Sequence, residues 1–355
     1  MSMPRQERAL EVAAAAGAEA LLATHVSTVT WLTGYAPPIE TGPNPWAAAP
    51  LALLAGDGPP VVVESEDEEA AARGLGCEVV NYTGYSLGPI ETTQHAARAL
   101  RMALDGRTRL ATETGALPVA LADGLTLVDV TDKLSLARAV KDDDELERLR
   151  RAIRVCDAGQ AEARRRASAG TTELEAWAAV RAAMEQAAGG RFPLLADFIS
   201  GSRTAGVEGP PGERLLTEGD LLIADLVPRI DGYWGDSCAT LCVGSASPSA
   251  RQAHMTVHER LERLLEACRP GVRSGELDAI AREGLRYPHH SGHGIGTTYH
   301  EEPRIVPDWE TVLEPGMVLA LEPAWYGEKE GVRLEWVVLV TEDGCQILSQ
   351  HELEL

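Results

Sequence analysis

Two patterns of hydrophobic and polar positions divide the chain. Up to about residue 135, short apolar runs alternate with segments in which apolar residues recur at helical spacing. The runs predict strands at 51–55, 61–65, 78–82 and 125–130, and the segments between them predict helices around 66–73 and 94–103. Because strands that alternate with helices are typical of an α/β domain, residues 1–136 are expected to form one.

A longer helical pattern opens the second part of the chain. Residues 141–170 carry acids at the start and arginines toward the end, as the helix dipole favours, and predict one long amphipathic helix. Gly170 ends it, and Thr172 with Glu175 forms a capping box for a helix over 173–188. Further helices are predicted at 248–268 and 274–285, and strands at 221–229, 233–243, 316–322 and 331–340. Residues 137–355 are therefore expected to form an α+β domain whose helices cover one side of a mostly antiparallel, curved sheet.

Size and charge narrow the class of protein. A chain of 355 residues suits two domains, and 45% hydrophobic with 24% charged residues is typical of a soluble globular protein. The net charge of −22 argues against nucleic acid and against an anionic membrane as partners, because both require a basic face.

Targeting signals and cysteines indicate the compartment. The first 22 residues scatter charges among alanines, which does not match a secretory signal, and no run approaches the ~18 apolar residues of a membrane span. The 6 cysteines are spread along the chain without CxxC pairs and are interpreted as buried thiols in a reducing compartment. The expected location is the cytoplasm.

The first candidate chemistry lies on a predicted hairpin. Asp231 and Gly232 form a favoured two-residue turn, which places Asp225 opposite Cys238 and puts Asp236 on the same face. A buried carboxylate without compensation costs several kcal/mol, so two of them on an apolar hairpin favour a bound cation. The alternative is that both point to solvent from the outer face.

A histidine cluster follows downstream. Four of the 9 histidines fall in PHHSGHGIGTTYHEEP: His289, His290, His293 and His300. Glycines flank His293, where they allow the backbone to approach a bound ion or substrate closely. A lone histidine is more often a surface residue, but a cluster beside two carboxylate strands favours a ligand or acid–base role.

Two glutamates complete the set. Glu322 ends the apolar run GMVLALE, and Glu335 lies in GVRLEWVVLV with Arg333 on the same strand face. A glutamate among apolar residues is costly unless it meets a metal or a proton donor. The candidate metal ligands are therefore Asp225, Asp236, His293, Glu322 and Glu335.

Four carboxylates and one imidazole suit divalent ions that prefer oxygen ligands. Mn²⁺ is the first candidate, with Co²⁺, Fe²⁺ or Zn²⁺ as the others, whereas a structural zinc would use thiolates. Two such ions about 3.5–4 Å apart lower the pKa of a shared water and polarise a carbonyl. The pattern predicts a dinuclear metallohydrolase that cleaves an amide or a related bond.

In the same order, these residues resemble the pita-bread metallopeptidases. The likeness rests on Asp-x10-Asp, GHGIG, GMVLALEP and GVRLE, and is greatest to the Xaa-Pro branch, the aminopeptidase P and prolidase group. It covers about 140–350, with GHGIGTTYHEEPRIVP as its most specific part. The first domain is similar to the creatinase-type N-terminal domain in its length and its WLTGY segment.

The resemblance implies an activity and a division of the ligands. It implies hydrolysis of the peptide bond before proline in short peptides by two divalent ions, in a homodimer. Asp225 and Asp236 would hold one ion, Asp236 and Glu335 would bridge to the second, and His293 with Glu322 would complete the second site.

The resemblance also implies roles around the ligands. His300 would steady the oxyanion that forms from the scissile carbonyl, and Glu322 would accept a proton. His289 would stand behind the ligands, and Arg333 would accompany the last of them.

Two positions depart from the family pattern. Glu208 stands where the peptidases usually carry a substrate-contacting histidine, and Ser237–Thr240 (SCAT) stands where a Thr-Arg-Thr run is usual. Glu208 either replaces a proton donor by an acid or, if the loop has shifted, is merely solvated. The departures favour a second function, hydrolase or lyase action on a small non-peptide amide or zwitterion. A third alternative is a metal-binding but catalytically silent interaction protein, against which the full ligand set with His300 argues.

Overall fold

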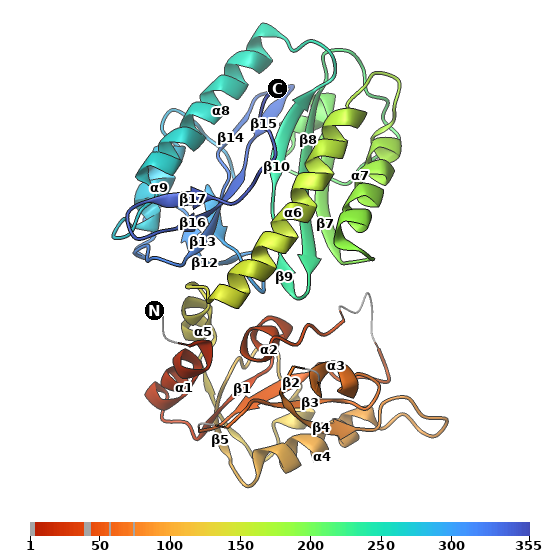
Figure 1. Ribbon diagram of the computed structural model, residues 1–355, viewed down its shortest axis with the longest axis vertical. Coiled ribbons are helices and arrows are strands. Elements are labelled where there is room, and N and C mark those ends of the chain that lie inside the picture. The colour runs from red at the N-terminus through yellow and green to blue at the C-terminus, as the bar shows by residue number, and fades with distance from the viewer. Residues whose placement is uncertain (1–3, 39–43, 57, 74) are drawn as a thin grey trace. The chain divides into compact units, whose positions relative to one another are not determined.

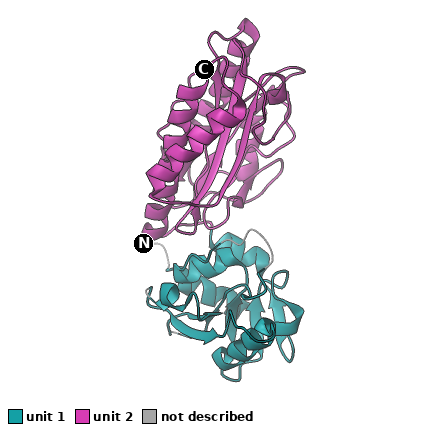
Figure 2. Ribbon diagram, turned by 90° about the vertical axis from the view of Figure 1, so that its right-hand side faces the viewer, with its two compact units in different colours: residues 1–138 teal, residues 139–355 magenta. Residues whose placement is uncertain are grey.

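The computed structural model describes residues 4–38, 44–56, 58–73 and 75–355. The chain divides into two compact units, residues 1–138 and residues 139–355 (Figure 2). Each unit has hydrophobic clusters of its own. Within the part of the chain that the structure describes, no helix is long and apolar enough to cross a membrane.

The first unit is an α/β domain, as predicted. Its strands are β1 (Ala20–Ala23), β2 (Leu51–Leu54), β3 (Val61–Ser65), β4 (Glu78–Tyr82), β5 (Arg109–Thr112) and β6 (Thr126–Asp129). They form one sheet in the order β4-β3-β2-β1-β5-β6, in which β1–β2 and β2–β3 are antiparallel and the other pairs parallel. Its helices are α1 (Arg5–Ala15), α2 (Val26–Thr33), α3 (Glu69–Arg73), α4 (Thr92–Leu104) and α5 (Thr131–Ala137).

Helices cover both faces of this sheet. In β1, Leu21 and Ala23 belong to a cluster with α1, α2 and α5, whereas Ala20 and Leu22 belong to a cluster with α4. A strand that is buried on both faces needs apolar residues at every position, which explains continuous runs such as ALLA and LALL.

The second unit is α+β, as predicted. Its helices are α6 (Asp143–Arg166), α7 (Glu173–Ala188), α8 (Pro248–Ala267) and α9 (Ser274–Ala281). Its strands are β7 (Leu194–Ser200), β8 (Leu221–Ile230), β9 (Tyr233–Trp234), β10 (Cys238–Cys242), β11 (Gly292–Gly294), β12 (Glu301–Ile305), β13 (Val318–Leu321), β14 (Ala324–Tyr326), β15 (Gly331–Arg333), β16 (Trp336–Val340) and β17 (Cys345–Ile347).

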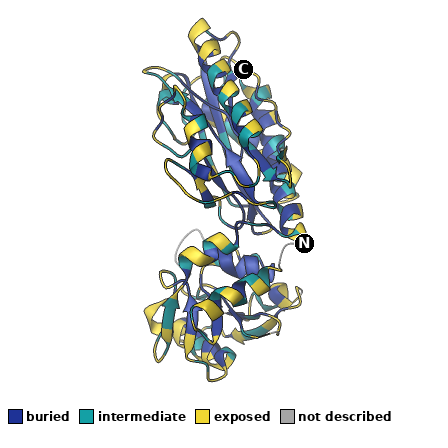
Figure 3. Cartoon of the chain, turned by 90° about the vertical axis from the view of Figure 1, so that its left-hand side faces the viewer, coloured by how far each residue is buried: buried dark blue, intermediate teal, exposed yellow. Residues whose placement is uncertain are grey.

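These strands pair antiparallel in three sheets. One has the order β10-β8-β7 with β9 on β8, one has the order β12-β11-β13-β16-β17, and β14 pairs with β15. The helices lie outside the strands, with α6 and α7 along the first sheet and α8 and α9 along the blue strands (Figure 1). The strands are buried, and the helices expose their outer faces (Figure 3). In this arrangement, the polar side chains in the interior of the unit can gather at the ends of strands.

Local signals in the sequence set the helix starts. Thr172 caps α7, with Glu175 N donating to Thr172 Oγ1 at 3.1 Å and Thr172 N donating to Glu175 Oε2 at 2.8 Å, which confirms the capping box. A second capping box, Asp142 with Glu145, starts α6. The helix ends at Arg166 and is therefore shorter than the predicted 141–170.

The predicted hairpin register is confirmed, but its second strand is interrupted. Asp231 and Gly232 both have positive φ, 49° and 87°, and Cys238 pairs with Asp225. Residues 235–237 leave the strand. Gly235 packs tightly against α6, where an added Cβ would lie 2.8 Å from the carbonyl of Ala152. The strand predicted at 331–340 breaks likewise, between β15 and β16.

Candidate metal centre

One cavity in the second unit, of about 440 Å³, gathers the predicted site residues. Its lining comes from separate stretches of the chain that the antiparallel sheets bring together. Every candidate ligand and catalytic residue belongs to the lining: Asp225, Asp236, His289, His293, His300, Glu322, Arg333 and Glu335.

Most candidate ligands lie where a strand ends or breaks. Asp236 lies between β9 and β10, Glu322 directly after β13, and Glu335 between β15 and β16, whereas Asp225 and His293 lie within β8 and β11. A residue at a break is released from the alternation of a regular strand, so its side chain turns toward the cavity without placing its neighbours there.

The glycines beside His293 allow neighbouring strands to pack closely. A Cβ at Gly292 would meet the carbonyl oxygen of Ala320, and one at Gly294 would meet that of Glu302. Both contacts are to neighbouring strands, because β11 lies between β12 and β13. The glycines therefore allow three backbones to approach, with His293 held on the middle one.

Three ligands converge most closely. The ligand atoms of Asp236, His293 and Glu335 all lie within 4.8 Å of one another, and the three residues are buried. Glu322 adjoins this trio, because His293 Nε2 lies 3.7 Å from Asp236 Oδ2 and 3.5 Å from Glu322 Oε1. The structure thus brings four of the five predicted ligands together.

Asp225 is held differently, by the buried Arg333. Arg333 Nη2 lies 2.8 Å from Asp225 Oδ2 and 2.9 Å from Asp197 Oδ2. Asp197 is the register partner of Asp225 across β7 and β8. Sequence reasoning missed Asp197, although an acid inside the strand LLADFIS is the same signal that singled out Asp225.

The electrostatics of the cluster match the requirement for cations. Burial raises the pKa of Asp225 to about 7 and raises the pKa values of Asp236 and Glu335 well above their usual range, and repulsion from Asp225 and Glu322 adds to the shifts of Asp236 and Glu335. Glu335 Oε1 is buried without a hydrogen-bond partner among the described residues. Buried carboxylates with an open oxygen fit divalent cations, since the donor set is rich in oxygen and includes one buried imidazole.

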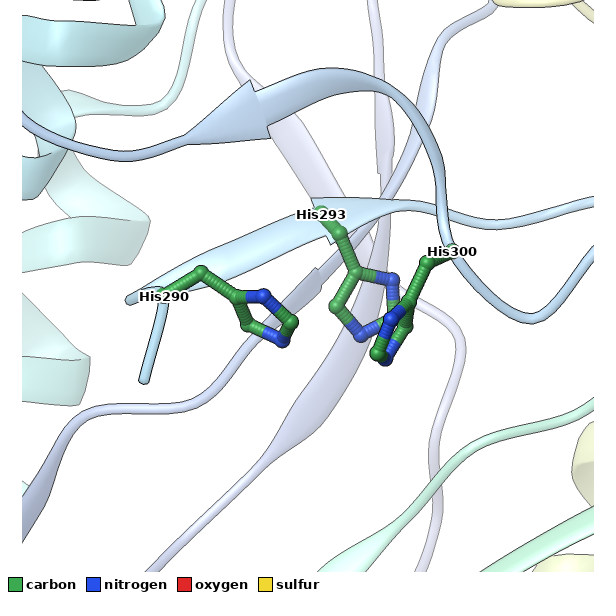
Figure 4. Close-up of side chains that lie close together, drawn as sticks. All are labelled: His290, His293 and His300. Atoms are coloured by element: carbon green, nitrogen blue, oxygen red, sulfur yellow. The ribbon is translucent and has the colours of Figure 1, made fainter. Parts of the chain in front are cut away.

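His290 is a further residue of the site, which the sequence placed in the histidine cluster without a role of its own. Its Nε2 lies 2.7 Å from Glu322 Oε1. The rings of His290, His293 and His300 turn toward one another (Figure 4), and their ligand atoms lie within 4.8 Å. Burial tends to raise the pKa of Glu322, but the hydrogen bond from His290 and the nearby imidazoles outweigh it and lower that pKa. The sequence signal that could have indicated a role for His290 is its position three residues before His293.

The imidazoles of His293 and His300 are neutral near pH 7. Burial, together with the adjacent histidines, lowers the pKa of His293 to about 3 and that of His300 to about 4. The two ring centroids are 4.2 Å apart. A neutral His293 can offer a lone pair to a metal, and a neutral His300 can donate one N–H to a substrate oxygen.

His289 and Arg333 form a chain of hydrogen bonds behind these groups. His289 Nδ1 lies 2.7 Å from the carbonyl of His290, so it donates there, and Nε2 then accepts from the Tyr326 hydroxyl at 3.0 Å. Tyr326 in turn accepts from Arg333 Nη1 at 3.2 Å. Both ring nitrogens of His289 are thus engaged, and its contacts orient the loop of His290.

Known sequences and structures match both units. The profile of metallopeptidase family M24 matches residues 147–342, and that of the creatinase/prolidase N-terminal domain matches residues 5–140. The chain is 35% identical over 235 residues to the Xaa-Pro dipeptidase of Pyrococcus furiosus. This match covers 64% of this chain and 67% of that protein.

Solved structures agree over nearly the whole chain. The crystal structure of the prolidase from Pyrococcus horikoshii OT3 superposes with a TM-score of 0.84 and 26% identity, covering 99% of both chains. Dipeptidase PepE from Mycobacterium ulcerans gives a TM-score of 0.79 and 29% identity, covering 99% of this chain and 96% of that one. These matches confirm the predicted combination of a creatinase-type first domain with a pita-bread second domain. The chain belongs to metallopeptidase family M24, in its Xaa-Pro peptidase branch.

Proposed function

We propose that this protein hydrolyses the peptide bond before proline in short peptides, with two divalent cations in the cavity of its second unit. The observation that carries the proposal is the buried cluster of Asp236, His293 and Glu335 beside Glu322 and Asp225. Relatives named Xaa-Pro dipeptidase and prolidase support the choice of bond.

The five residues Asp225, Asp236, His293, Glu322 and Glu335 would hold the cations, with Mn²⁺ as the proposed metal and Co²⁺, Fe²⁺ or Zn²⁺ as the alternatives. When bound, such ions polarise a carbonyl and lower the pKa of water. Arg333 acts through its ion pair with Asp225, which fixes the direction of that carboxylate.

The remaining chemistry belongs to Glu322 and His300. Glu322 is ionised near neutral pH, because its pKa is lowered, and it can take a proton from an attacking water. His300 is neutral, so its N–H can donate to the carbonyl oxygen as negative charge develops there. Its ring lies against His293, at the mouth of the cluster.

The proposal also covers the location, the oligomeric state and the partners of the enzyme. We place it in the cytoplasm as a homodimer that acts on small peptides and not on nucleic acid or membranes. The 6 free cysteines support the cytoplasm, and the net charge of −22 argues against nucleic acid and membranes as partners. Sedimentation of the purified protein would test the dimer.

A peptide panel tests the function. Protein reloaded with Mn²⁺ is assayed on Xaa-Pro dipeptides and tripeptides, with Asp236→Asn as the blank and metal content measured for both. Turnover that the variant lacks is the expected result, and the ratio of dipeptide to tripeptide rates separates a prolidase from an aminopeptidase P. A protein that holds metal and cleaves no member of the panel would overturn the proposal and point to a small non-peptide amide or zwitterion.

A further inference from the structure

Glu208 occupies a loop whose backbone is fixed on both sides. The carbonyl of Val207 accepts a hydrogen bond from Arg333 Nη1 at 2.8 Å. On the other side, Gly209 N donates to Asp197 Oδ1 at 2.9 Å, and the carbonyl of Gly209 accepts from Phe198 N at 3.0 Å. The residue between them is therefore held at a defined place, and it belongs to the lining of the cavity.

At that place, the side chain of Glu208 is available to a substrate. It is exposed, and no ion pair or side-chain hydrogen bond joins it to another residue in the described part of the chain. Its two neighbours are bound by Asp197 and Arg333, which themselves contact Asp225. The same ion-pair chain that orients a candidate metal ligand thus places an uncommitted carboxylate in the cavity.

The net charge of the cavity lining indicates a role for the Glu208 carboxylate. The described lining contains six carboxylates, one guanidinium and no lysine: Asp197, Glu208, Asp225, Asp236, Glu322 and Glu335, with Arg333. Two divalent cations would balance the four candidate carboxylate ligands, and Arg333 balances Asp197. Glu208 then remains as one uncompensated negative charge.

We infer that Glu208 is a specificity-determining residue that selects substrates with a cationic group, an ammonium or a guanidinium, and disfavours a carboxylate at the same place. This inference rests on the proposed function and adds the charge class of the substrate to it. Arg333 cannot serve a substrate carboxylate, because its guanidinium already binds two aspartates, a carbonyl and a hydroxyl.

Matched peptides that differ in one charge test the inference. Arginine and citrulline have nearly the same shape, and only arginine is charged. The pair is placed before proline in one series and after it in a second, and a third series compares free with acetylated amino termini. For each series, kcat/KM is measured on the metal-loaded enzyme, and peptide affinity is measured by titration calorimetry.

The wild type is expected to favour the cationic member of one series by about twofold to fivefold, the range of exposed ion pairs. Glu208→Gln should bring that ratio close to one, and Glu208→Lys should invert it. Glu213→Gln, an exposed glutamate outside the cavity lining, should keep the wild-type ratio. The series that responds identifies the cation as the amino terminus or a side chain.

The outcomes separate this inference from the proposed function. Cleavage of the peptides with ratios that Glu208→Gln leaves unchanged would overturn the inference and keep the function. A charge preference in affinity that Glu208→Gln abolishes, without cleavage of any peptide, would keep the inference and overturn the function. Equal affinity for both members of every series, with equal kcat/KM wherever the peptides are cleaved, overturns the inference.

Discussion

At the scale of single residues, the surroundings of the candidate site residues set their protonation. Burial favours the protonated form of Asp236 and Glu335 and the neutral form of His293 and His300. Strongly shifted pKa values in neighbouring groups are typical of functional sites, whereas a structural ion-pair network would satisfy its members with one another. Glu335 Oε1, buried without a partner among the described residues, shows that this cluster does not.

Asp236→Asn should lose metal and activity together. The amide removes one negative charge and one ligand oxygen from the closest trio, while it preserves the size of the side chain. The measurement is metal per chain after dialysis, together with Xaa-Pro turnover. Glu213→Gln is the control, and a variant that retains two metals per chain would contradict the role of Asp236.

His300→Ala should keep metal and lower kcat by about 10²–10³, the usual effect of removing one oxyanion donor. KM should change much less, because the hydrogen bond strengthens as charge develops. A control is His258→Ala, which changes a histidine on α8 outside the cavity lining. Loss of metal from His300→Ala would instead make His300 a ligand, which its proximity to His290 and His293 allows.

At the scale of elements, a buried ion pair connects the start of α6 with the histidine loop. Lys141 Nζ lies 3.0 Å from Glu301 Oε2, and both side chains are almost fully buried. Glu301 Oε1 also accepts from Thr298 N at 3.1 Å, and Thr298 Oγ1 donates to the carbonyl of His300. The pair therefore holds the loop that presents His300 to the cavity.

Lys141→Met should lower the free energy of unfolding by about 3–5 kcal/mol, because it removes the cation from a buried carboxylate. The double variant Lys141→Met with Glu301→Gln should recover much of this loss, since no charge is then left buried at that place. Chemical denaturation measures both. A double variant as unstable as the sum of the single variants would show that the two side chains do not act as a pair.

At the scale of the whole molecule, the cavity couples metal binding to the stability of the second unit. Its buried carboxylates repel one another until a proton or a cation joins them. Binding of any ion to the folded state alone raises the free energy of unfolding. Metal removal should therefore affect stability as well as activity, and in a manner that depends on pH.

For metal-free protein, Tm should fall as the pH rises from 5 to 8. Burial raises the pKa of Asp225 to about 7, whereas an aspartate in the unfolded chain titrates near about 3.9. The folded state then binds more protons than the unfolded state, so stability is lost as the pH rises between these values. Scanning calorimetry after chelation measures the change. The metal-free Asp225→Asn variant should have a shallower slope, and a wild-type Tm that is flat over this window would contradict the argument.

Local sequence signals determined much of the fold. The Asp231–Gly232 turn and the capping box of Thr172 depend on residues next to one another, so the register of β8 and the start of α7 could be predicted. Strands β1 and β5 were not predicted. Their sequences, ALLA and RLAT, are short and lack the alternation with β-branched residues that distinguishes a strand from a helix.

The sequence by itself determined which residues are the candidate ligands, because acids and a histidine in apolar segments are costly without a partner. Only the tertiary structure decided how they meet. The breaks at Asp236 and Glu335 arise from packing between elements that lie far apart in the chain, such as Gly235 against α6. Likewise, the carbonyl of Val207 reaches Arg333 across more than a hundred residues, and this contact, which no local pattern encodes, places Glu208 in the cavity.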